Sequence, residues 1–98
     1  MSVVIIGGHE RMVRQYEEIC ASHGCSAKVF VKERSGFKKN LGVPDLMILL
    51  TNTVSHKMVK SAVSEAKKNS IQIARAHSSS ASALTNVLRQ HGAEPVNA

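Results

Sequence analysis

The stretch RAHSSSASALTNVL, residues 75–88, places a histidine and three consecutive serines at the expected start of a helix. Hydroxyl groups and imidazole rings hydrogen-bond to anions, and the first N–H groups of a helix carry a partial positive charge that favours such ligands. Two other loops have a similar composition, GGHER at 7–11 and TNTVSH at 51–56. Together the loops predict a site for a small anionic ligand, above all a phosphorylated one.

These loops supply glycines that let a backbone approach a ligand closely, together with hydroxyls, an amide, imidazoles and a guanidinium. The candidate ligand-binding residues are Gly7, Gly8, His9, Arg11, Thr51, Asn52, Ser55, His56, His77, Ser78, Ser79 and Ser80. A simpler interpretation exists, because serine commonly caps a helix and needs no ligand to do so. It accounts for Ser55 and for one of the three consecutive serines, and a tight turn accounts for the glycines. No catalytic residue, metal ligand or cofactor is assigned, and a non-catalytic binding or regulatory role is favoured over an enzymatic one.

The elements that must position these loops alternate along the chain. Continuous apolar runs predict strands at 2–8, 26–32, 44–52 and 71–76. Apolar residues at three- and four-residue spacing predict helices at 9–24, 55–70 and 79–92, with a further turn of helix near 36–40. This alternation predicts an α/β fold with one small, doubly wound parallel sheet of four strands in the order 2-1-3-4, a Rossmann-like or flavodoxin-like three-layer arrangement. The three loops would then share the carboxyl edge of the sheet.

The composition limits the partners. The 98 residues predict a single domain at 1–92 followed by a tail at 93–98. A net charge of +6 favours anionic partners. Nucleic acid fits the charge alone, because only 3% of the residues are aromatic and no basic helix stripe is present.

The cysteines and the apolar runs bear on location. Cys20 and Cys25 fit neither a disulfide framework nor a zinc finger, so we expect two free thiols in a reducing cytoplasm. Cys20 is expected in the core, and Cys25 in a turn where it is more exposed. The longest apolar run, LMILL, is too short to cross a membrane, so no membrane association is expected.

Motifs of better-known chemistries do not match. The chain lacks the glycine fingerprint of dinucleotide-binding folds, the phosphate-binding P-loop and an aspartate at the end of the third strand. Two alternatives stay open beside the anion site. One is a histidine phosphoryl carrier that uses His9, and the other is a metal or haem site that uses His9, His56 or His77.

The segments VVIIGGHERMVRQYEEI, PDLMILLTNTVSHKMVKSAVSEAKK and ARAHSSSASALTNVL resemble the bacterial family of unknown function numbered 2325. The similarity runs from residue 3 to about residue 88, and its most specific parts are the GGH turn, the TNTVSH loop and the HSSSASAL stretch. Ser79 stands where the family pattern often has a glycine. The resemblance implies a small α/β domain and implies no reaction.

The last predicted helix has a wide apolar face, made up of Ala81, Ala83, Leu84, Val87 and Leu88. The predicted fourth strand would also be an open edge of the sheet. Pairing with a second copy would cover both surfaces, and twofold dimers are the commonest oligomers. We therefore expect a homodimer with the last helix or the fourth strand at its interface.

Overall fold

The computed structural model of the chain describes residues 1–32 and 36–93. Its strands are β1 (Ser2–Gly7), β2 (Ser26–Phe30), β3 (Leu46–Leu50) and β4 (Gln72–Ala76). Its helices are a 3-10 turn η1 (Glu10–Met12), α1 (Val13–Ser22), α2 (Phe37–Leu41), α3 (His56–Lys68) and α4 (Ala81–Gln90). The predicted alternation of strands and helices is therefore present, and the turn of helix expected near 36–40 is α2.

The four strands form one parallel sheet in the order β2-β1-β3-β4, which confirms the predicted α/β class and strand order. β1 and β3 lie in the middle of the sheet and are buried on both faces, which explains their uninterrupted apolar sequences. β2 and β4 form the two edges and mix apolar with polar residues. The expectation that the fourth strand is an edge is confirmed.

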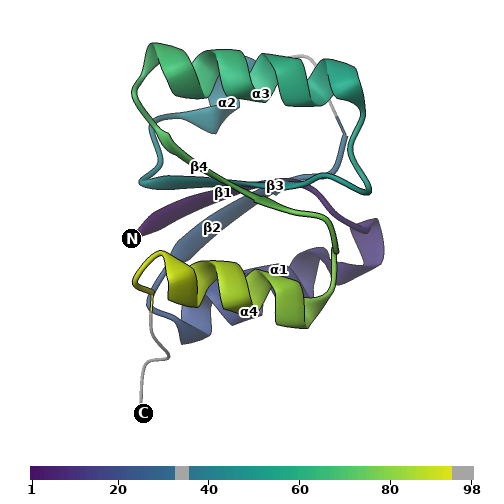
Figure 1. The fold of residues 1–98 in the computed structure, drawn as a ribbon, viewed down its shortest axis with the longest axis vertical. Coiled ribbons are helices and arrows are strands. Elements are labelled where there is room, and N and C mark those ends of the chain that lie inside the picture. The colour runs from purple at the N-terminus through teal and green to yellow at the C-terminus, as the bar shows by residue number, and fades with distance from the viewer. Residues whose placement is uncertain (33–35, 94–98) are drawn as a thin grey trace.

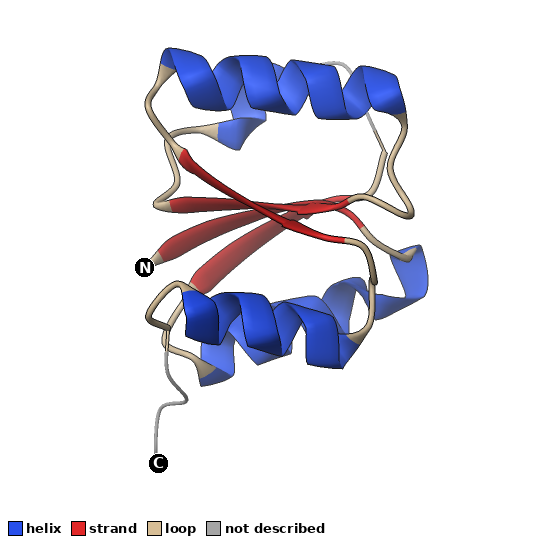
Figure 2. Ribbon diagram, viewed as in Figure 1, coloured by secondary structure: helices blue, strands red, loops and turns tan. Residues whose placement is uncertain are grey.

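Helices cover both faces of the sheet. α1 and α4 pack on one face, and α2 and α3 on the other, as Figure 1 shows. Successive residues of a strand point to opposite faces, so the central strands serve two cores. Ile5 and Ile48 face the α1 and α4 layer, whereas Ile6 and Met47 face the α2 and α3 layer. Figure 2 shows the resulting three layers, with the sheet between the helices.

The cysteines lie at the end of α1. Both are free thiols, and both are buried. Cys25 follows a turn and is the more exposed of the two, as expected, but the difference is small, because 6% of its surface is accessible against 0% for Cys20. Gly24 adopts a φ of +72° and folds the chain back, so the N–H of Cys25 donates to the carbonyl of Cys20 at 2.8 Å. Burial, with a smaller contribution from Cys25, raises the pKa of the Cys20 thiol to about 12.

The end of the described chain is tied to α4. Ala93, the first residue of the expected tail, is buried, and its N–H donates to the carbonyl of Leu88 at 2.8 Å. The rest of that tail, 94–98, lies outside the described residues. Among the helices of the described ranges, none has the length and apolar character that a membrane span requires.

Candidate functional site

The loops that follow β1, β3 and β4 lie at the carboxyl edge of the sheet. The connection that leaves β1 leads to β2 on one side, and the connection that leaves β3 leads to β4 on the other. Ligands of open α/β sheets bind where the chain diverges in this way. A pocket of about 730 Å³ opens there, and we call it the switch-point pocket. It is lined by Gly8, His9, Glu10, Arg11, Met12 and Thr53.

A relay of hydrogen bonds joins the three loops beneath this pocket. The N–H of Gly8 donates to Thr53 Oγ1 at 2.7 Å, Thr53 Oγ1 is 2.8 Å from Ser79 Oγ, and Ser79 Oγ donates to Asn52 Oδ1 at 2.6 Å. Because Ser79 uses its only proton on Asn52, the hydroxyl of Thr53 is the donor between the two hydroxyls. Thr53 Oγ1 also lies 3.2 Å from the carbonyl oxygen of Leu50. The relay holds the loops in one fixed arrangement.

Tyr16 fixes the same loops from below. Its side chain is fully buried on α1, and its hydroxyl donates to the carbonyl of Ser79 at 2.7 Å. The same oxygen accepts the N–H of His9 at 3.3 Å. Gly8 lies against the ring, since a Cβ atom at Gly8 would be only 2.6 Å from Tyr16 Cε2. The first and last of the three loops are therefore joined through one phenol.

Ser79 is buried and stabilises the loop that follows β4. Its side chain is 3% exposed, and its hydroxyl is committed to Asn52 and Thr53. Ser80 caps α4 by accepting the N–H of Ala83, and Ser78 Oγ donates to Ser80 Oγ at 3.0 Å. The hydroxyls of the serine run thus satisfy groups of the chain itself, and the capping interpretation accounts for one of them.

The remaining predicted residues are spread along the same edge. Ser55 caps α3 by accepting the N–H of Met58 at 3.2 Å, as the capping interpretation expects, and His56 is exposed at the first position of that helix. His77 is exposed, and its Nδ1 is 3.3 Å from Thr51 Oγ1. Gly7 is buried. Three of the predicted site residues, Gly8, His9 and Arg11, line the switch-point pocket, and the others do not.

The sequence interpretation missed Glu10 and Met12, which line the pocket, and it also missed Thr53 and Tyr16, which fix the loops of this site. Thr53 belongs to the TNTVSH loop that was singled out, but composition alone does not separate it from Thr51. Tyr16 falls on the apolar stripe of the first helix, and a buried phenol needs a hydrogen-bond partner. As the one tyrosine of the chain, it carried a signal that something polar lay below the loops.

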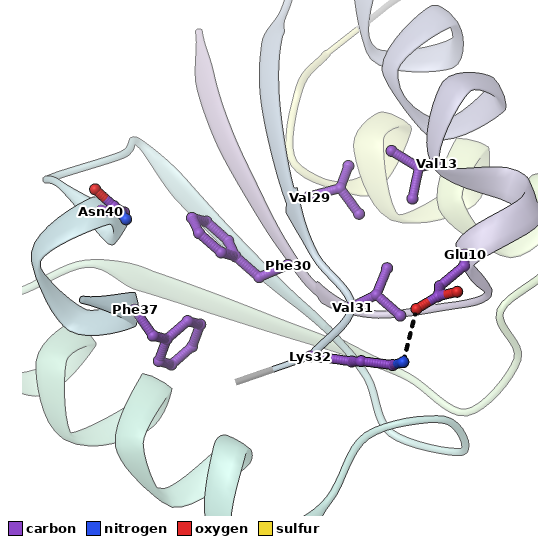
Figure 3. Close-up of a pocket in the computed structure, with 8 residues that line it drawn as sticks. All are labelled: Glu10, Val13, Val29, Phe30, Val31, Lys32, Phe37 and Asn40. Carbon is purple, nitrogen blue, oxygen red and sulfur yellow. Dashed lines mark ion pairs between the residues drawn. The ribbon is translucent and has the colours of Figure 1, made fainter. Parts of the chain in front are cut away.

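A second pocket lies beside the end of β2, and we call it the β2 pocket. Its volume is about 520 Å³, and Figure 3 shows its lining, which consists of Glu10, Val13, Val29, Phe30, Val31, Lys32, Phe37 and Asn40. Phe30 and Phe37 meet edge to face with ring centroids 5.3 Å apart. The charged members neutralise each other, since Lys32 Nζ is 3.0 Å from Glu10 Oε1. Polar and apolar groups both line this pocket, and among the described residues its two charged side chains pair with each other.

Metal ligation by the histidines finds no geometric support. Within residues 1–32 and 36–93, no three histidine, cysteine, aspartate or glutamate side chains converge on one position. The three histidines are exposed and lie in different places: His9 follows β1, His56 begins α3 and His77 follows β4. A single imidazole is enough to bind haem, so this geometry leaves the haem alternative as a prediction.

Comparison with known proteins agrees with the resemblance found in the sequence. The family model described as "Uncharacterized protein conserved in bacteria (DUF2325)" matches residues 2–91, from the first residue of β1 to just beyond the end of α4. No curated protein and no solved structure matches the chain. The matched range contains the whole sheet, all of its helices and every residue of the switch-point pocket, and the chain belongs to this family of bacterial proteins.

Proposed function

We propose that the chain is a non-catalytic binding domain for a small anionic ligand, a phosphorylated one above all, held in the switch-point pocket. One observation carries the proposal: the pocket opens between the loops after β1 and β3, and Arg11 and His9 line it. The guanidinium group of an arginine can donate two parallel hydrogen bonds to phosphate or carboxylate oxygens. Within the described ranges Arg11 makes no ion pair, so its charge is available to a ligand.

The hydrogen bonds of the loops narrow down which groups would hold the anion. The N–H groups of Gly8 and His9 already donate to Thr53 and Tyr16. The next two N–H groups, those of Glu10 and Arg11, open the helical turn η1 and have no acceptor within it. The anion would therefore bind to the side chains of His9 and Arg11 and to these two N–H groups. The glycines would act through the shape of the loop and not as donors.

Glu10 opposes an anion in the same pocket. Its carboxylate lines the pocket, and Lys32 offsets its charge at 3.0 Å. Both side chains are well exposed, so water and salt weaken this ion pair. Among the described residues that line it, the pocket therefore has one cation without an ion pair, Arg11, and one ion-paired anion, Glu10. This balance fits a ligand that carries few charges and binds with modest affinity.

Calorimetric titration with inorganic phosphate, pyrophosphate, AMP and ATP tests the proposal, with adenosine as the uncharged control. We expect at least one anion to bind. Arg11→Ala should lower the affinity for that anion by about tenfold, because one charge-assisted hydrogen bond contributes roughly 1.5 kcal/mol or more. Arg14→Ala is the matched control, since Arg14 is exposed on α1 and does not line the pocket. His77→Ala should leave the fold intact, and weaker binding in that variant would extend the site to the third loop.

Four results would contradict the proposal, and two of them would assign another function. No binding of any anion at millimolar concentration to the folded protein would remove it, as would equal losses in Arg11→Ala and Arg14→Ala. A mass increase of one phosphate after incubation with acetyl phosphate, lost in His9→Ala, would make the chain a phosphoryl carrier. A shifted Soret band on titration with haemin, lost in a histidine variant, would make it a haem-binding protein.

The homodimer and the cytoplasmic location belong to the same proposal. The apolar residues of α4 give the dimer less support than the sequence suggests, because Leu84, Val87 and Leu88 are buried within one chain and Ala81 is exposed. Sedimentation at tens of micromolar checks the dimer, and a mass near one chain would refute it. The two buried free thiols are in keeping with the reducing conditions of the cytoplasm.

A further inference from the structure

The outer edge of β4 carries backbone N–H and carbonyl groups that are not paired with another strand. The N–H of Thr51 donates to the carbonyl of Ala76 at 2.9 Å, so the polar backbone groups of Ala76 face β3. These groups point to opposite edges in successive residues of a strand. Those of Ala74 therefore also face β3, and those of Ile73 and Arg75 point away from the sheet. Within the described ranges no loop, turn or side-chain hydrogen bond reaches the N–H or carbonyl groups of Ile73 and Arg75, and the ladder to β3 uses the groups of the alternate residues.

No further strand of the described chain pairs with this edge. β4 pairs only with β3 among the described strands, and its other side is the border of the sheet. Figure 2 shows β4 in front of the other strands, with α3 on one side of the sheet and α4 on the other.

A positively charged groove runs beside the same edge, and we call it the β4 groove. It has a volume of about 480 Å³ and is lined by Val59, Lys60, Val63, Ser64, Lys67 and Arg75. The two valines are half-buried, and the three cations are exposed. None of the three cations makes an ion pair with a described residue. Five of its lining residues belong to α3, and Arg75 belongs to β4. The lining has no acidic member, so the groove attracts negative charge to the part of the edge beside Arg75.

Charge beside an edge strand often protects it from pairing with a second copy of the same chain. Here it does so selectively. Antiparallel pairing of β4 with β4 of a second chain would continue the sheet and bring two α3 helices together on one face. The groove cations Lys60, Lys67 and Arg75 of both chains would then meet. The same cations favour a partner strand with acidic side chains.

We propose that β4 is a docking edge for an extended, acidic segment of another protein, which adds a fifth strand beside β4. Its backbone would bond to the outward groups of Ile73 and Arg75, as in other cases of strand addition. One set of its alternate side chains would lie on the α3 side of the sheet, where carboxylates meet Lys60, Lys67 and Arg75. The other set would lie on the α4 side, where apolar groups continue the face of the sheet. This surface is separate from the switch-point pocket, and its test is independent of the ligand proposed there.

The test uses a blocked peptide of the sequence Thr-Glu-Val-Glu-Val-Glu-Thr, labelled with a fluorophore and followed by anisotropy at low ionic strength. Two further peptides carry N-methyl groups on alternate amides, one on the odd residues and one on the even residues. Strand addition presents only one set of amides to β4, so one methylated peptide should lose binding and the other should keep it. A peptide with lysine in place of glutamate should not bind.

Variants of the protein complete the design. Lys67→Glu should lower the affinity for the peptide by about tenfold, because it replaces an attraction with a repulsion. Lys68→Glu, at the neighbouring exposed position outside the groove, should leave affinity within about twofold. Ile73→Pro removes one outward N–H and should abolish binding with the fold retained, because proline is tolerated where the N–H faces away from the sheet. Circular dichroism checks that retention, and the methylated peptides test the edge in the unaltered chain.

Several results would overturn the proposal. Equal binding of both methylated peptides would show attraction by charge without strand addition. Absence of binding at millimolar peptide would remove the docking edge. A dimer in sedimentation that Ile73→Pro dissociates would assign the edge to a second copy of the chain. A mixed-sequence oligonucleotide that binds more tightly than the peptide, and is lost in Lys67→Glu, would assign the groove to nucleic acid.

Discussion

Replacing Gly8 with alanine should destabilise the protein far more than an ordinary glycine substitution. Gly8 has a φ of +93°, where an L side chain costs roughly 1–2 kcal/mol. The new Cβ would also lie 2.6 Å from Tyr16 Cε2 and 3.0 Å from Tyr16 Oη. Such overpacking in a buried position costs roughly 1–3 kcal/mol. A displaced Tyr16 would lose its hydrogen bond to Ser79, which adds roughly 1 kcal/mol.

The total for Gly8→Ala is therefore about 3–6 kcal/mol, a large part of the roughly 5–15 kcal/mol that stabilises a typical domain. Gly92→Ala is the matched control, because Gly92 has a φ of +85° and its Cβ would meet no atom within 4 Å. That variant should lose only the roughly 1–2 kcal/mol of backbone strain. Urea unfolding followed by circular dichroism measures both free energies of unfolding.

The difference between the two variants isolates the contact with Tyr16. If Gly8→Ala is no less stable than Gly92→Ala, Tyr16 does not pack closely against Gly8. That result would also refute the role of Tyr16 in fixing the loops. If Gly8→Ala does not fold, Tyr16→Phe tests the same contacts more gently. It leaves the carbonyl of Ser79 and the N–H of His9 without their partner, at a cost of roughly 1–3 kcal/mol.

Other predictions follow from the same contacts. The raised pKa of the Cys20 thiol, about 12 against an ordinary 9.0, means that the unfolded chain ionises first as pH rises. The contribution of Cys20 to stability is therefore complete below pH 9 and is lost toward pH 12, and Cys20→Ala should flatten the alkaline decline in the free energy of unfolding measured in urea. Ser79→Ala should cost roughly 1–2 kcal/mol by the same measurement, whereas Ser82→Ala on exposed α4 should stay within roughly 0.5 kcal/mol. Glu10→Gln should leave stability within roughly 1 kcal/mol, because its ion pair with Lys32 is exposed, and should tighten anion binding in calorimetry; weaker binding would argue against an anion in that pocket.

The fold was predictable because its signals are collective. Continuous apolar runs distinguish the buried strands β1 and β3 from amphipathic helices, and the alternation of the two kinds of element dictates a parallel sheet. The meeting of three polar loops follows from the sheet in turn, since parallel strands end at one edge. No single residue decides any of these conclusions.

The site was less predictable because it depends on individual side-chain directions. Ser78, Ser79 and Ser80 look alike in the sequence, but only Ser79 turns inward, because its loop approaches Tyr16 and Asn52. The position of Cys25 depends on one glycine turn at the end of α1, which folds it over the helix. A pattern of residue types carries no information on such rotations about single bonds.

The relay that joins Gly8, Thr53, Ser79 and Asn52 affects which hydrogen-bonding group Asn52 exposes at the carboxyl edge of the sheet. Each hydroxyl in it both donates and accepts, and a half-turn of the Asn52 amide exchanges its oxygen and nitrogen without moving any other heavy atom. Asn52 would then donate to Ser79, Ser79 to Thr53, and Thr53 to the carbonyl of Leu50 at 3.2 Å, while Gly8 still donates to Thr53. The exposed end of Asn52 would change from donor to acceptor in the same event. The directions of two hydroxyl protons, partly buried among the three loops, would thus decide whether Asn52 presents a donor or an acceptor to a molecule that contacts this surface.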